Sequence, residues 1–97
     1  MADALTTRER TALKARAHAL EPLVHVGGAG VTDGLVAEVD RALTAHELIK
    51  VKVATDDRVA RVAAGDEIAA RTGASVVHRV GKIVILWRKR PDEDESV

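Results

Sequence analysis

The spacing of apolar residues along the chain predicts three helices and four strands. In the first helix, Thr6 and Glu9 have the spacing of a capping box, in which each side chain accepts a hydrogen bond from the other residue's backbone amide. Apolar residues at helical spacing follow as far as Leu20. Pro22 ends the helix, because the residue before a proline disfavours helical geometry. The buried face of this helix is expected to consist of Leu13, Ala17 and Leu20.

A short strand and a glycine-rich turn connect this helix to the second one. Residues 23–26 are predicted to be extended, and residues 27–30 read Gly-Gly-Ala-Gly. Thr32 is a good N-cap for the helix that follows, because its hydroxyl can accept a hydrogen bond from an amide of the first turn. The apolar positions of that helix recur at helical spacing and are Leu35, Val36, Val39 and Leu43.

From residue 49 the apolar pattern changes to a period of two residues. Ile49, Val51 and Val53 fall on one side of this predicted strand, and Lys50 and Lys52 fall on the other. Such a strand covers a core with one face, and we expect both lysines on the opposite face of the sheet.

The last third of the chain predicts one more helix and a β-hairpin. Residues 55–57 supply a cap and an acidic first turn, and Gly73 ends the helix as a glycine just past its C-terminus. Residues 76–80 and 83–87 are predicted strands, and Gly81-Lys82 between them suits a tight turn with glycine first. The buried stripe of the helix is expected to comprise Val59, Val62, Ala63 and either Ile68 or Ala69.

The resulting element order is α-β-α-β-α-β-β, which predicts a single compact α/β domain. Helices that alternate with strands favour a mixed sheet of four strands, with a right-handed crossover at each β-α-β step. We assign residues 1–90 to this domain and residues 91–97 to an acidic, solvated tail. No internal repeat and no long linker divide the chain.

The zero net charge of the chain combines a basic domain with an acidic C-terminal segment. Lys and Arg number 15 and Asp and Glu number 15, but four of the acids stand together at 92–95. Residues 1–91 therefore hold 15 basic residues against 11 acidic ones, a net charge of +4. A domain with this charge can bind phosphate groups if its basic side chains converge on one surface.

The residue types that the chain lacks exclude several functions. With no cysteine there can be no disulfide, thiolate nucleophile or cysteine metal site. The four histidines have no metal-ligand spacing and no serine lies in a nucleophile motif, so we expect no metal, no cofactor and no enzyme activity. No apolar stretch is long enough to span a membrane, and a cytoplasmic location is expected. The single aromatic residue, Trp87, is expected to pack against the core rather than stack on a base.

The turn formed by Gly27, Gly28, Ala29 and Gly30 is the first candidate for binding. A G-x-x-G loop between a strand and a helix lets a phosphate approach the backbone, and in KH-type domains it clamps about four nucleotides. The following helix start adds free amides and a partial positive charge. Two alternatives remain, a merely tight turn and a degraded dinucleotide-binding turn that extends to Gly34.

Basic side chains from four predicted elements are the second candidate. Those on the first helix lie one turn apart, two more share a strand face, one tips the hairpin and one ends the last strand. Spacing along the chain does not determine whether they converge. The candidate phosphate contacts are Arg10, Lys14, Lys50, Lys52, Lys82 and Arg88.

Five segments, taken together and in order, resemble the CRM domain family in its stand-alone bacterial, YhbY-like form. The resemblance covers roughly residues 5–90, and its most specific segment is His46–Lys52. Because several motifs occur in the right order, the resemblance is far more specific than a G-x-x-G loop alone. The other segments are Ala17–Pro22, Val26–Gly34, Arg71–Ala74 and Val80–Lys82 with the apolar strand that ends in Leu86–Arg88.

The resemblance implies a fold similar to the C-terminal domain of translation initiation factor three. It also implies RNA binding during assembly of the large ribosomal subunit, without catalysis. We expect the protein to be a monomer. Residues 27–30 would form the family's RNA-binding loop, with Lys14 in support. The chain departs from the family where Gly28 and Ala29 replace the usual basic or polar loop residues, and where Trp87 replaces a tyrosine.

Two other hypotheses remain open beside RNA binding. The protein could be a ribosome-associated interaction factor with little direct RNA contact, as the neutral total charge favours. It could also be a small nucleotide-dependent enzyme, which only the glycine loop supports.

Overall fold

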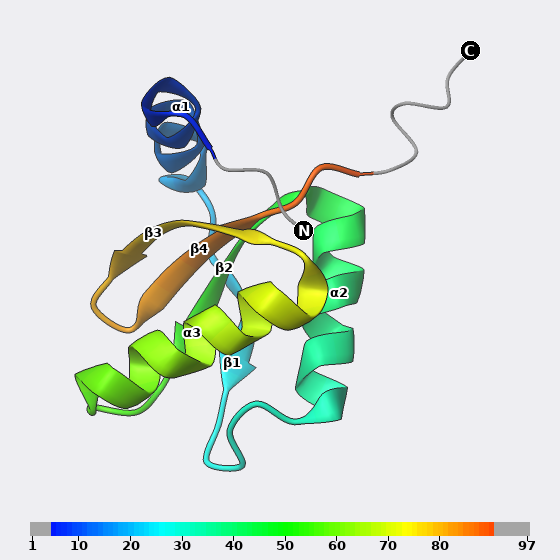
Figure 1. Ribbon diagram of the computed structural model, residues 1–97, viewed down its shortest axis with the longest axis vertical. Coiled ribbons are helices and arrows are strands. Elements are labelled where there is room, and N and C mark those ends of the chain that lie inside the picture. The colour runs from blue at the N-terminus through cyan, green and yellow to red at the C-terminus, as the bar shows by residue number, and fades with distance from the viewer. Residues whose placement is uncertain (1–4, 91–97) are drawn as a thin grey trace.

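The computed structural model describes residues 5–90, and within them it contains the three helices and four strands that the sequence predicts (Figure 1). The acidic tail predicted for residues 91–97 lies outside the described residues. No helix among residues 5–90 is long and apolar enough to cross a membrane. The elements are α1 (Thr7–Ala17), β1 (Pro22–Val26), α2 (Asp33–His46), β2 (Leu48–Val53), α3 (Arg58–Thr72), β3 (Ser75–Val80) and β4 (Ile83–Trp87).

The strands form one mixed sheet in the order β1-β2-β4-β3, which confirms the predicted fold class. β1 and β2 are parallel, as a β-α-β unit requires, and the other two pairs are antiparallel. The C-terminal ends of β1 and β2 therefore lie at the same end of the sheet as the turn that joins β3 to β4. The glycine loop follows β1 at this end (Figure 1).

Helices cover the two faces of the sheet unequally. α2 and α3 pack on one face over the main hydrophobic core, whose fully buried side chains include Val39, Leu43, Ile49 and Ile68. α1 packs alone on the other face over a smaller cluster. That cluster consists of Leu13, Ala17, Leu48, Val77 and Ile85, with Leu5, Leu20, Ile83 and Trp87 packed against it. The expected core position of Trp87 is thus confirmed.

The helix ends use the capping residues that the sequence predicts. The Glu9 amide donates to Thr6 Oγ1 at 3.0 Å and the Thr6 amide donates to Glu9 Oε1 at 2.9 Å, which completes the capping box. Asp57 caps α3, and Gly73 ends it with a φ of +75°, a conformation that a residue with a side chain rarely adopts.

The buried face of α3 was predicted wrongly in its first half. Val59 is 77% exposed and Ala63 is also exposed, whereas Gly65, Ile68 and Ala69 are buried. Gly65 lies at the centre of the true face, where a Cβ would stand 3.5 Å from Val84 of β4. Glycine contributes no apolar signal to a periodic pattern, so the pattern pointed to the neighbouring face instead.

Candidate nucleic-acid interface

The part of the sheet that α1 leaves uncovered forms a groove lined by basic side chains. The groove has a volume of about 390 Å³ and lies beside α1, over β2, β3 and β4. Its floor is apolar, with Ile83 and Ile85 at its centre. The polar side chains that line it are Lys14 and His18 of α1, Lys50 of β2 and His78 of β3. The structure therefore brings together two of the lysines that the sequence singled out.

Lys50 and Lys52 both lie on this face, as their alternation with buried valines predicts. Lys50 is half-buried, and its Nζ donates to the carbonyl oxygen of Leu20 at 3.0 Å. Lys52 is exposed, and its pairing positions on the two flanking strands are His25 and Ile83. Lys52 thus extends the basic surface from the groove toward the strand that leads into the glycine loop.

The glycine loop is a tight turn with open space around it. The Gly30 amide donates to the carbonyl oxygen of Gly27 at 3.0 Å, and Gly30 has a φ of +77°. Gly30 is therefore required by the turn itself. Gly28 has no such requirement, because its φ is not in the left-handed region and an added Cβ would meet nothing within 4 Å.

The start of α2 is less open to an anion than the sequence suggested. The Thr32 hydroxyl accepts a hydrogen bond from the Leu35 amide at 3.1 Å, so one amide of the first turn is already satisfied. Asp33 stands in the first turn and its carboxylate lies 2.6 Å from Arg71, which raises the pKa of the Arg71 guanidinium. The negative charge of Asp33 offsets the positive end of the helix dipole.

Arg10 is engaged inside the protein rather than presented to solvent. Its Nη1 donates to the carbonyl oxygens of Val76 and Val77, at 2.6 Å and 3.0 Å. These carbonyls lie at an irregularity of β3, where the register with β4 shifts between Val76 and His78. A bulge leaves backbone groups without strand partners, and Arg10 satisfies them.

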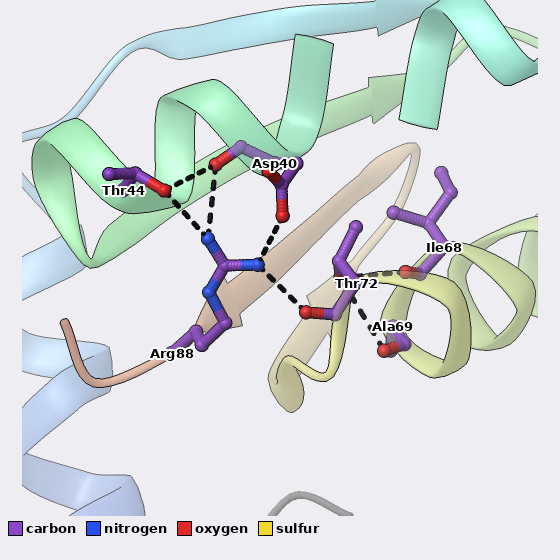
Figure 2. A network of polar contacts seen from close by, with 6 residues as sticks. All are labelled: Asp40, Thr44, Ile68, Ala69, Thr72 and Arg88. Carbon is purple, nitrogen blue, oxygen red and sulfur yellow. Dashed lines mark hydrogen bonds and ion pairs between the residues drawn. The ribbon is translucent and has the colours of Figure 1, made fainter. Parts of the chain in front are cut away.

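Arg88 is likewise held by the protein, in a network that joins three elements (Figure 2). Its Nη1 lies 2.6 Å from Asp40 Oδ1 and donates to the Thr72 carbonyl at 2.8 Å. Its Nη2 donates to the Asp40 carbonyl at 3.1 Å and to Thr44 Oγ1 at 2.9 Å. With its side chain only 19% exposed, Arg88 links α2 and α3 to the end of β4 instead of facing the groove.

Lys82 lies at the β3–β4 turn, with its Nζ 2.9 Å from Asp56 Oδ1. This hydrogen bond and the charge of Lys82 lower the pKa of the Asp56 carboxyl. Of the predicted basic contacts, Lys14, Lys50 and Lys52 share one face, Lys82 sits at the end of the sheet, and Arg10 and Arg88 are engaged within the protein.

The sequence reasoning did not place His18, His25 and His78 at this surface. The strand alternation could have found His25, which stands at the position paired with Lys52. His78 could not be found in this way, because it follows the irregularity in β3. Among residues 5–90 no group of histidines and carboxylates could hold a metal ion.

These features define the class of small α/β domains that present a partly open, basic sheet face rather than an enclosed pocket. The chain belongs to the CRS1/YhbY (CRM) domain family, whose model matches residues 5–88. The family resemblance of the five sequence segments is thereby confirmed.

Two relatives and one solved structure extend this comparison. A protein of Haemophilus influenzae that is named an RNA-binding protein is 42% identical, over 96% of this chain and 92% of its own length. A Pseudomonas aeruginosa protein, whose name also describes it as RNA-binding, is 38% identical over 97% of this chain and 90% of its own. A solution structure from Staphylococcus aureus shares the fold with a TM-score of 0.81, at 23% identity, covering 95% of this chain and 96% of that one.

Proposed function

We propose that the protein is a non-catalytic RNA-binding protein that acts in assembly of the large ribosomal subunit. It binds ribosomal RNA or its precursor in the cytoplasm, as a monomer and without a cofactor. The observation that carries this proposal is the basic groove, in which Lys14 and Lys50 face one open surface that continues through Lys52 toward the glycine loop. The names of the relatives support RNA as the partner.

The chemistry of this surface favours the RNA backbone as its target. Lysines bind phosphate as point charges, and exposed loop amides can donate to phosphate oxygens. The chain has no phenylalanine or tyrosine, and its one tryptophan packs against the smaller core cluster, so stacking of several bases is unavailable. Such contacts position an RNA without reading its sequence, and specificity then comes from RNA shape.

The loop is best tested at Gly28, because Gly30 has a positive φ and its replacement would strain the turn. We expect Gly28→Asp to weaken binding to a large-subunit ribosomal RNA transcript about tenfold or more, since it places a carboxylate beside the phosphates. Gly28→Asn, which has the same shape without the charge, should weaken binding less. Filter binding measures both, and circular dichroism verifies the fold.

A folded Gly28→Asp protein with the affinity of the wild type would remove the loop from the interface. Measuring the affinity at increasing salt concentrations separates RNA binding from the hypothesis of an interaction factor, because RNA binding through phosphate contacts weakens steeply as salt rises. Weak salt dependence, with retained binding to ribosomal proteins, would favour the interaction factor instead. In cells, crosslinking and sequencing should enrich large-subunit ribosomal RNA, and recovery without it would contradict the proposal.

A further inference from the structure

A second set of cationic side chains lies on the other face of the sheet, between α3 and the β3–β4 hairpin. They line a pocket of about 320 Å³, a size at the small end of ligand pockets. Apolar side chains, among them Val53 and Val62, make up part of its lining. The cationic residues are Arg58 and Arg61 of α3, Arg79 of β3 and Lys82 of the hairpin turn.

Two of the four cations have acidic partners within the protein. Lys82 pairs with Asp56, and Arg79 pairs with Asp66. These pairs neutralise the hairpin side of the pocket.

The other two cations, Arg58 and Arg61, form no ion pair within the described range 5–90. Arg61 Nη1 donates to the carbonyl oxygens of Thr55 and Asp56, at 3.1 Å and 3.0 Å, which fixes its position, and its charge contributes to the lowered pKa of the Asp56 carboxyl. The Asp57 carboxylate caps α3 by accepting from the Val59 and Ala60 amides and keeps its negative charge. The four cations of the pocket thus lie near three carboxylates, those of Asp56, Asp57 and Asp66, and one positive charge is in excess, with the exposed Arg58 as the cation that makes no hydrogen bond or ion pair of its own among the described residues.

These two arginines lie on the same side of α3, because residues three apart on a helix are neighbours. Like charges at that spacing repel and destabilise a helix slightly, and an anion between them removes the repulsion. A guanidinium held by backbone carbonyls also loses little further freedom when it binds a phosphate. The apolar side chains beside it suit the carbon face of a ribose.

The pocket lies at the same end of the sheet as the glycine loop. Val53 lines the pocket, pairs with Val26 just before the loop, and donates its amide to the Lys82 carbonyl at 2.7 Å. In Figure 1 the start of α3 lies next to the hairpin, on the side of the sheet where β1 runs into the loop. One RNA strand that leaves the loop can therefore pass over the end of the sheet to the pocket.

We propose that this pocket binds a backbone phosphate of the RNA, as a second contact for the strand that lies on the glycine loop. This inference rests on the proposed function, because it takes RNA as the ligand. It adds a contact on the opposite face from the basic groove, which makes the RNA wrap around the end of the sheet.

Arg58→Gln is the sharpest test, because Arg58 is exposed, has no hydrogen bond or ion pair in the described part of the chain, and can be replaced without disturbing the fold. With a large-subunit ribosomal RNA transcript we expect binding about tenfold weaker at low salt. The plot of log affinity against log salt should lose about 0.7 to 1 of its slope, as removal of one phosphate contact predicts.

Arg41→Gln is the matched control, because Arg41 is an exposed arginine of α2 that lies far from the pocket. Its neighbour Asp40 binds Arg88 at the other end of the sheet. It should leave affinity and slope unchanged.

Wild-type affinity in Arg58→Gln, beside weakened binding in Gly28→Asp, overturns this inference and leaves the proposed function standing. No binding of the transcript by the wild type overturns both. Tight binding of uridine monophosphate at the pocket, without an effect of Arg58→Gln on RNA, would make it a nucleotide site and refute the inference.

Discussion

Arg88 shows how a single side chain can be diverted from the role that its charge suggests. Its guanidinium satisfies the carboxylate and carbonyl of Asp40, the hydroxyl of Thr44 and the carbonyl of Thr72 at once (Figure 2). The planar fork of arginine is suited to several acceptors in fixed directions, and the point charge of lysine is not. We interpret Arg88 as a structural link between the two helices and the sheet.

This interpretation predicts a loss of stability at position 88 that leaves the RNA surface intact. Arg88→Ala should lower the free energy of unfolding by about 1–3 kcal/mol, because it leaves the part-buried carbonyl of Thr72 without this donor and removes a mostly buried side chain. Arg88→Lys should recover only part of this loss. Guanidinium chloride unfolding measures both variants, and Arg8→Ala, at an exposed position of α1, should change stability by no more than about 0.5 kcal/mol.

At the residue scale, the sequence predicts the contacts of residues whose partners are close along the chain. The Thr6–Glu9 box and the face shared by Lys50 and Lys52 follow from local spacing, and the structure confirms them. Arg10 and Arg88 find their acceptors 66 and 48 residues away. Such contacts depend on how helices pack on the sheet, and spacing along the chain does not encode them.

At the scale of the elements, α3 has a weak point where it packs on β4, at Gly65. Gly65 allows α3 to approach β4 closely, but a glycine inside a helix costs about 1 kcal/mol relative to alanine. The Cβ that alanine would add stands at an ordinary contact distance of 3.5 Å from Val84. Close approach is therefore compatible with a methyl group at this position.

Gly65→Ala is accordingly predicted to stabilise the protein by about 0.5–1 kcal/mol. In a domain of this size, 1 kcal/mol corresponds to a rise in melting temperature of about 4–8 °C. Differential scanning calorimetry measures the change. The reverse substitution Ala63→Gly, on the exposed side of the same helix, should lower stability by a similar amount. A lower melting temperature in Gly65→Ala would mean that Val84 cannot accept the methyl group.

On the scale of the whole molecule, charge is divided between a basic domain and the acids at 92–95. All 15 basic residues lie within residues 1–91, whereas four of the 15 acidic residues lie beyond them. A negative segment attached to a positive domain competes with the phosphates of RNA for the basic side chains at low ionic strength. The segment can thereby limit binding to RNA of any sequence.

Deletion of residues 92–97 should then tighten binding to unrelated RNA at low salt and have little effect at high salt, where these charges are screened. The matched control keeps the length and replaces the four acids by their amides, Asp92→Asn, Glu93→Gln, Asp94→Asn and Glu95→Gln. Both proteins should behave alike in filter binding. Unchanged affinity at low salt in both would show that the segment does not compete with RNA.

Leu5 lies beside Trp87 and Lys89, and the described chain thus begins and ends near the end of β4, which is the end of the sheet away from the glycine loop. The glycine loop, the hairpin turn and the start of α3 lie at the opposite end of the sheet. A solid support or a second protein joined directly at residue 5 or 90 would be attached at the end of the sheet opposite the loop. The domain is therefore suited to tethering, with its loops facing outward from whatever carries it.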